Sequence, residues 1–243
     1  MFQRMTVLAA LAAGVLGLAP PAGVAQPEKK TTPADQAKIK KALQELQEFI
    51  GLWDLEGTQK VGTKPEVWKE KVSWGWKFKD GDAWLTVEFK SNDGKEKGKY
   101  YQSGEVRYDL EKKKYILTLT PSAKDEPKQE FVGEMKSGTL KVERKDAKTG
   151  DVHRITMNTL ADGIRLAFKV EKQDGGKGLF SGVYAMTGNK DGESIAGGGP
   201  KKPECVVSGG AASIAVSHNG KTYYVCCSGC RDEFNANPSK YAK

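Results

Sequence analysis

Residues 71–91 read KVSWGWKFKDGDAWLTVEFKS, and the spacing of the large apolar side chains in this stretch decides the fold. Every second residue is apolar on both sides of the turn sequence Asp80-Gly81-Asp82, which gives Val72, Trp74, Trp76 and Phe78, then Leu85, Val87 and Phe89. A period of two places these side chains on one face of an extended chain. Because Asp and Gly favour tight turns, the stretch predicts two antiparallel strands joined as a hairpin.

The same alternation continues in both directions, from Leu52 to Thr187. Turn residues separate the further runs, which are Val106–Leu110, Tyr115–Thr120, Gln129–Met135, Thr139–Arg144, Val152–Leu160, Ile164–Val170 and Leu179–Met186. About ten short strands with one apolar and one polar face predict an antiparallel barrel or a sandwich. We favour the barrel, since closure leaves no strand edge unpaired. The predicted barrel domain spans residues 51–188.

The segment before the barrel, residues 26–50, predicts one amphipathic helix. Thr32 is suited to cap its start, Pro33 to occupy its first position, and Asp35 stands three residues after the cap. Gly51 ends it. An apolar stripe, which must pack against the next domain, recurs at helical spacing: Ile39, Ala42, Leu43, Leu46 and Ile50.

The sequence Phe49–Gly57, FIGLWDLEG, resembles the start of lipocalin-like barrels, in which a Gly-x-Trp first strand follows a helix or loop that plugs one barrel end. This resemblance implies a lipocalin-like barrel with room for an apolar small molecule. Tryptophans suited to line such a ligand pocket are Trp68, Trp74, Trp76 and Trp84. The alternative is that these tryptophans fill the core.

Residues 1–25, MFQRMTVLAALAAGVLGLAPPAGVA, have the pattern of a secretory signal peptide. Arg4 precedes an apolar run, and small residues lead to a cleavage position near Ala25. The apolar run is short for a membrane span, although an uncleaved anchor is the alternative. We expect an exported chain, periplasmic or extracellular, without stable membrane insertion after cleavage.

The charge balance and the absence of motifs limit the functional classes. Lysine and arginine total 39 against 31 acidic residues, but the excess is scattered lysine, so we expect no nucleic-acid partner. Hydrolase elbow, zinc-protease, phosphate-loop and dinucleotide motifs do not occur, so we expect no enzyme. His153 is the one histidine of the strand region, and we expect it to be a hydrogen-bonded residue of the barrel rather than a ligand.

All four cysteines lie after a Gly/Pro-rich linker, residues 189–203 (NKDGESIAGGGPKKP), and they define a module over residues 204–243. Ile214–His218 and Thr222–Cys226 predict two strands around the hairpin turn Asn219-Gly220. A short helix is expected over Arg231–Asn235. The order of elements is thus ββα. The cysteines of this module are Cys205, Cys226, Cys227 and Cys230.

Cys226 and Cys230 stand four positions apart across Ser228-Gly229, and Cys205 arrives from the segment before the hairpin, so three thiols can converge on one ion. The start of the following helix favours the thiolate form, which is the form that binds metal. Cys227 is either an additional ligand or points away, because neighbours on a strand face opposite sides.

The stretches YYVCCSGC (223–230) and NPSKY (237–241), together with the spacing of Cys205, Cys226 and Cys230, resemble the YHS and TRASH domains. These are treble-clef-like cysteine modules associated with heavy-metal sensing, trafficking and resistance. Related zinc knuckles carry a cysteine where this chain has Ser208, which leaves three thiols at the family's positions.

Two functions remain open from the sequence. The first is an exported protein that captures, traffics or senses a soft metal, Cu(I) or Zn, through Cys205, Cys226, Cys230 and Cys227. Three thiolates suit Cu(I), whereas zinc needs a fourth ligand from Cys227, His218 or water. The second is an apolar small-molecule carrier whose cysteine module is stapled by disulfides, since exported cysteines commonly pair. Redox chemistry at Cys227-Ser228-Gly229-Cys230 is a lesser alternative.

Overall fold

The alternating stretches form ten antiparallel strands in the computed structural model, which describes residues 31–193 and 202–242. The predicted signal peptide and residues 194–201 of the predicted linker lie outside the described residues. The strands are β1 (Gly51–Val61), β2 (Lys64–Lys79), β3 (Asp82–Ser91), β4 (Tyr101–Asp109), β5 (Lys114–Pro121), β6 (Gln129–Lys136), β7 (Thr139–Lys145), β8 (Val152–Leu160), β9 (Arg165–Gln173) and β10 (Ser181–Lys190).

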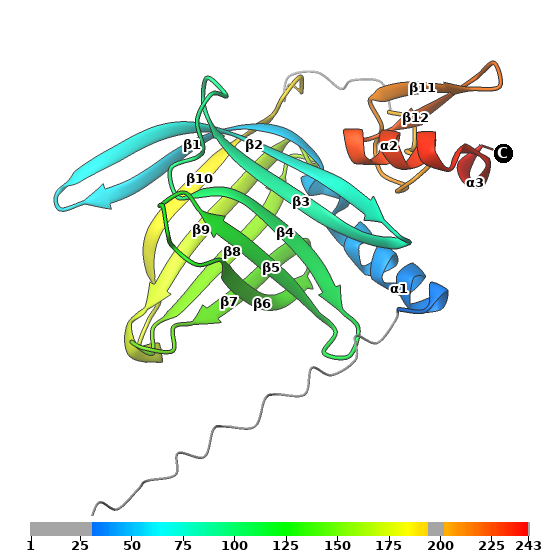
Figure 1. Cartoon of the computed structure of the whole chain (residues 1–243). Coiled ribbons are helices and arrows are strands. Elements are labelled where there is room, and N and C mark those ends of the chain that lie inside the picture. Colours follow the sequence, from blue (N-terminus) through cyan, green and yellow to red (C-terminus); the bar gives the residue numbers. More distant parts are fainter. Residues whose placement is uncertain (1–30, 194–201, 243) are drawn as a thin grey trace, which may run out of the picture. The chain divides into compact units, whose positions relative to one another are not determined.

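These strands close into a barrel in which each pairs with its neighbours in sequence and β1 pairs with β10 (Figure 1). The prediction of a mainly β chain with a closed antiparallel barrel is confirmed, and the sandwich is wrong. Closure depends on a glycine at the β1–β10 seam. A Cβ placed on Gly188 would lie 1.8 Å from the carbonyl oxygen of Asp54, so any other residue there would push the two strands apart.

Several strand boundaries differ from the expectation. β4 begins at Tyr101, five residues before the predicted Val106. The prediction missed this part of the strand because its residues are mostly polar or glycine. Leu179 lies outside β10 and is almost fully exposed, since the turn at Gly178 adopts a positive φ of 81°. β10 continues to Lys190, so the strand takes the first two residues of the predicted linker.

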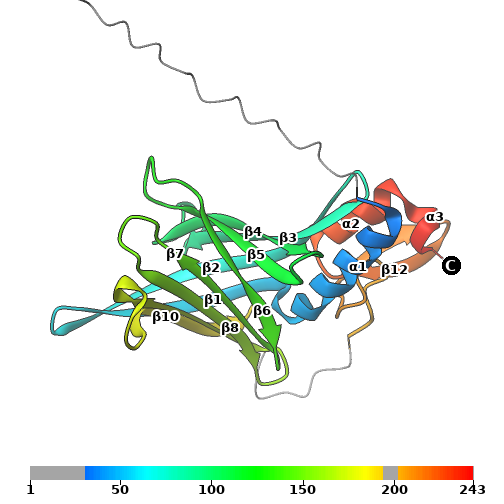
Figure 2. The ribbon, with the colours of Figure 1, turned by 90° about the horizontal axis from the view of Figure 1, so that it is seen from below.

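The N-terminal helix α1 (Pro33–Leu43) is capped as predicted, with the Asp35 amide donating to the Thr32 hydroxyl at 3.2 Å. It continues as the 3₁₀ turn η1 (Gln44–Phe49) rather than as one α-helix to Gly51. Its apolar stripe is buried with the barrel core and includes Leu43, Leu46, Phe49 and Ile50. Figure 2 shows α1 across one end of the barrel, where the Tyr115 hydroxyl donates to the Ala42 carbonyl at 2.8 Å.

The barrel interior is filled by large side chains. Trp53 is fully buried, and its indole N–H donates to the Phe49 carbonyl at 2.8 Å, which ties β1 to η1. Inward side chains of the strands complete the core, among them Trp76, Leu85, Phe89, Leu117, Leu119, Phe131 and Leu140. Among the described residues, no helix has the length and apolar character needed to cross a membrane.

Lys190, partly buried at the end of β10, places a charged group beside the seam. Its ammonium donates to the Glu48 carbonyl at 3.0 Å and lies 4.8 Å from the centre of the Trp53 ring. Burial, reinforced by the charge of Lys202, lowers the pKa of Lys190 to about 8. Because an unfolded lysine titrates near 10.4, the unfolded state binds more protons between about pH 8 and pH 10.5, and stability must rise with pH across that window.

We therefore expect Lys190→Met to raise the free energy of unfolding at pH 7 by about 2 kcal/mol, since it removes the cost of partly burying a charge. The gain should disappear as the pH approaches 10.5. Urea unfolding of both proteins from pH 7 to 10.5, under reducing conditions, measures the difference. Lys77→Met, at an exposed position of β2, is the control that should show no such pH-dependent difference. A constant difference at all pH values would contradict the prediction.

After the linker, the chain forms β11 (Ile214–His218), β12 (Lys221–Val225), α2 (Ser228–Ala236) and α3 (Pro238–Tyr241). The predicted ββα order is confirmed. Asn219 and Gly220 have φ values of 49° and 74°, as a two-residue hairpin turn with two positive φ angles requires. α2 begins at Ser228 rather than at Arg231, so Cys230 lies in its first turn.

Candidate metal centre

Three of the four cysteines meet in the C-terminal module. Cys205 follows the short bridge between Glu204 and Ala211, Cys226 follows β12, and Cys230 lies in the first turn of α2. Their sulfur atoms all lie within 4.8 Å of one another, and those of Cys226 and Cys230 are 3.5 Å apart. All three are buried free thiols. An S–S bond of about 2.05 Å is much shorter than these separations.

A tight loop positions Cys205. Its amide donates to the Gly210 carbonyl at 2.6 Å, and the Gly209 amide donates back to the Cys205 carbonyl at 2.8 Å. The Ser208 amide donates to the Cys205 sulfur at 3.4 Å, and the buried Ser208 hydroxyl lies 3.3 Å from the Cys226 sulfur. Ser208 therefore brings a backbone donor and a hydroxyl oxygen directly to the thiol cluster.

Hydrogen bonds between the thiols shift their pKa values in opposite directions. Hydrogen bonds from Cys226 and Cys230, and then from Ser208, hold the pKa of Cys205 far below its usual range. The pKa values of Cys226 and Cys230 are raised in turn, because they donate to the neighbouring sulfurs and are buried. A thiophilic cation would displace the remaining protons, so its binding must strengthen as the pH rises.

Polar residues of the N-terminal helical segment hold the loop that carries Cys205. The Lys40 ammonium donates to the Val207 carbonyl, and the Gln44 amide donates to the Ser208 carbonyl at 2.7 Å. Lys40 and Gln44 are one helical turn apart. The positive charge of Lys40 favours ionised thiols at Cys205 and Cys230, and their attraction opposes the lowering of the Lys40 pKa, which burial causes. The sequence signal for this contact is the polar spacing i, i+4, and it was missed.

Cys227 faces a different partner. Its sulfur accepts a hydrogen bond of 3.3 Å from the backbone amide of Trp76 in β2, and it lies 3.9 Å from the Cys226 sulfur. It does not belong to the group of sulfurs within 4.8 Å of one another. Sequence reasoning had left Cys227 either as a ligand or as pointing away. The structure places it against the barrel.

The Trp76 peptide group is free to bind Cys227 because β2 extends beyond the end of β1. The last β2 residue paired with β1 is Trp74, opposite Gly51, whereas the pairing with β3 continues to Lys79. The helix start packs on this free edge. A Cβ placed on Gly229 would lie 1.6 Å from the Trp76 carbonyl oxygen, so only glycine permits the approach.

The four tryptophans proposed as pocket residues do not line a common pocket among the described hollows. Trp74 and Trp76 are buried in the core, and the Trp76 indole donates to the Gln47 side chain at 2.9 Å. Trp84 lies under the guanidinium of Arg107, 4.4 Å from its ring centre. Trp68, partly buried, donates to the buried carboxylate of Glu70 at 2.9 Å. Burial raises the pKa of Glu70.

The two histidines are not part of the thiol group. His218 lies edge-on to the Phe234 ring, with 6.3 Å between the ring centres. His153 is half-buried in β8, and its pKa is lowered by burial and by the charges of Arg144 and Lys172.

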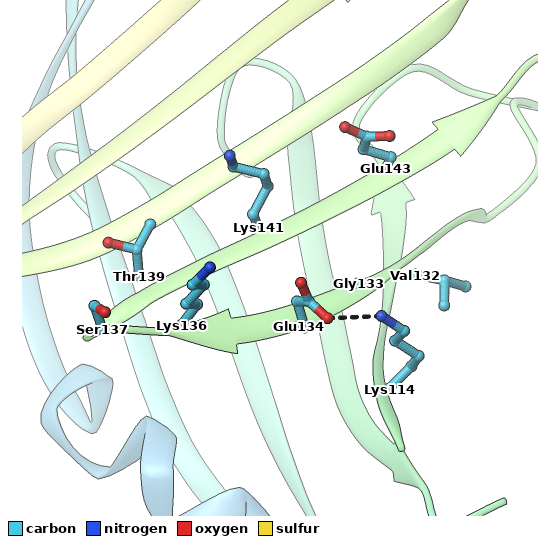
Figure 3. Close-up of a pocket in the computed structure, with 9 residues that line it drawn as sticks. All are labelled: Lys114, Val132, Gly133, Glu134, Lys136, Ser137, Thr139, Lys141 and Glu143. Atoms are coloured by element: carbon cyan, nitrogen blue, oxygen red, sulfur yellow. Dashed lines mark hydrogen bonds and ion pairs between the residues drawn. The ribbon is translucent and has the colours of Figure 1, made fainter. Parts of the chain in front are cut away.

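One surface hollow of the described residues, about 540 Å³, lies on the polar face of β6 and β7 and not at the tryptophans (Figure 3). Its lining is mostly charged, and Lys114 and Glu134 form an ion pair of 2.7 Å across it. Another, about 430 Å³, lies between the β1–β2 hairpin and the start of β10 and includes Pro65, Val183 and Tyr184. Neither contains the four tryptophans proposed for a ligand pocket.

The fold and the cluster define an antiparallel β-barrel protein with a C-terminal cysteine cluster that could hold a metal ion. The sequence matches no family model and no curated protein. Among solved structures, the chain is similar to Rv2717c from M. tuberculosis, with 17% identity and a TM-score of 0.40. The similarity covers 62% of this chain and 97% of that one, and it is too distant to support a function.

Proposed function

We propose that the chain is a soft-metal-binding protein that holds Cu(I) or Zn through the thiolates of Cys205, Cys226 and Cys230. The observation that carries the proposal is the convergence of these three buried sulfurs, none of them bonded to another, within 4.8 Å. Thiolates are the ligands that these two cations prefer.

The spacing of the sulfurs suits an ion. A metal–sulfur distance of about 2.3 Å implies sulfurs about 4 Å apart in a planar three-coordinate site. The Cys226–Cys230 separation of 3.5 Å needs only a small adjustment to reach that value. Lys40 and the start of α2 place positive charge beside the thiolates, which offsets part of the net negative charge of such a complex.

The resemblance of the module to YHS and TRASH domains supports the same function, because those modules are associated with heavy metals. The ββα order and the hairpin turn agree with that resemblance. On this proposal the signal-like residues 1–25 export the chain, and the module captures, traffics or senses the ion outside the cytoplasm.

Metal analysis of the purified full chain tests the proposal. Protein prepared under reducing, anaerobic conditions should take up one Cu(I) or one Zn per chain, with a thiolate-to-metal absorption band in the ultraviolet for Cu(I). Thiol titration in denaturant should find four reactive thiols before loading. Far less than one metal per chain would overturn the proposal. A mass spectrum of the exported protein with paired cysteines would instead support a stapled module.

A further inference from the structure

The most informative cysteine for metal choice is the one outside the three-thiol group. Cys227 is adjacent in sequence to a proposed ligand, is buried, and has its sulfur only 3.9 Å from that of Cys226. It is therefore the nearest candidate for a fourth thiolate. Its hydrogen bond to the Trp76 amide, contributed by a strand about 150 residues earlier, holds it in place.

Two contacts fix this arrangement from the barrel side. The Trp76 amide donates a hydrogen bond to the Cys227 sulfur, and the Trp76 carbonyl lies directly against Gly229. The Cβ and sulfur of Cys227 also face Gly75, each 3.9 Å from where a Cβ on that residue would lie. These contacts hold the thiol on the β2 side, so turning it toward the cluster must break its hydrogen bond to the Trp76 amide.

We propose that the free edge of β2 sets the coordination number of the metal centre, because it withholds the Cys227 thiolate and leaves three sulfurs for a three-coordinate soft cation. This inference rests on the proposed function. Zinc normally takes four ligands in closed protein sites, and a closed four-thiolate zinc site here requires Cys227. While Cys227 stays on β2, zinc must take water or the Ser208 hydroxyl as its fourth ligand. Cu(I) is satisfied by the three remaining thiolates.

X-ray absorption spectroscopy at the zinc edge, on the zinc-loaded wild-type chain, is the direct test. We expect three sulfur atoms and one lighter atom around zinc, and four sulfur atoms would overturn the inference. This measurement needs no variant and does not depend on any variant folding.

Variants test the mechanism through zinc affinity, measured by competition with a chromogenic chelator. Cys227→Ser should leave the zinc affinity of the wild type within about twofold. Gly229→Ala, which forces the helix start off β2, should raise zinc affinity about tenfold by releasing the Cys227 thiolate. Adding Cys227→Ser to Gly229→Ala should remove that gain. Cu(I) affinity should stay unchanged in all three proteins.

The outcomes separate the inference from the proposed function. A tenfold loss of zinc affinity in Cys227→Ser alone would mean that Cys227 already binds, and would overturn the inference while the metal site stands. No gain in a folded Gly229→Ala chain would overturn it as well. If Gly229→Ala does not fold, the sulfur count around zinc in the wild-type chain, which needs no variant, decides the inference. Failure of every protein to bind either metal would overturn the proposed function, and the inference with it.

Discussion

A chain carrying Cys226→Ser is expected to bind Cu(I) about a hundred- to a thousandfold more weakly than the wild type. Structural thiolate sites contribute about 10–16 kcal/mol in total, so each of three ligands accounts for several kcal/mol. Cys226 is central, since its sulfur contacts Cys230 at 3.5 Å and the Ser208 hydroxyl at 3.3 Å. Serine keeps the size of the side chain but offers a poor ligand for a soft ion.

Competition against a Cu(I)-specific chelator measures this loss, and Cys227→Ser is the matched control. It changes the neighbouring residue in the same way, at a thiol that lies outside the three-sulfur group. Equal losses in the two variants would show that Cys226 and Cys227 are equivalent and would contradict the assigned set. Cys205→Ser and Cys230→Ser should behave like Cys226→Ser.

Trp53→Ala is expected to lower the free energy of unfolding by about 3–5 kcal/mol. The side chain is fully buried, so its removal leaves a large cavity between β1 and η1. It also removes the hydrogen bond from the indole to the Phe49 carbonyl. The ring supports the Lys190 ammonium as well, 4.8 Å from its centre.

Trp53→Phe separates these contributions. It retains most of the buried ring and loses the hydrogen bond, so we expect a smaller loss of about 1–2 kcal/mol. Denaturant unfolding provides both values, provided that the variants have the same dependence of unfolding free energy on denaturant concentration. A loss below 1 kcal/mol for Trp53→Ala would mean that the end of the barrel is not packed as described.

The strands were predictable because burial on one face imposes a period of two. Residues 71–91 form β2 and β3 as expected, and the number of strands favoured closure, which β1 and β10 achieve. The beginning of β4 was missed because Tyr101–Gly104 lacks this alternation. The role of the tryptophans was not predictable, since alternation shows that a side chain points inward but not whether space remains beside it.

The cysteine cluster was predictable only within the module. Local spacing brings Cys226 and Cys230 together through a helix start, and the hairpin turn was recognisable from Asn219-Gly220. The contacts of Cys227 with Trp76 and of Lys40 with Val207 join residues more than 150 positions apart. These contacts join parts of the chain that are far apart in sequence, so the i, i+4 spacing of Lys40 and Gln44 shows a shared helix face but not what that face binds.

The β2 strand that extends past β1 also bears on solubility. Its unpaired peptide groups beyond Trp74 would form a template for strand addition from another chain if they were exposed. The helix start, with Cys227 on the amide and Gly229 on the carbonyl of Trp76, covers that template. We expect a chain truncated before the cysteine module to present this edge to other molecules and to form intermolecular sheets more readily.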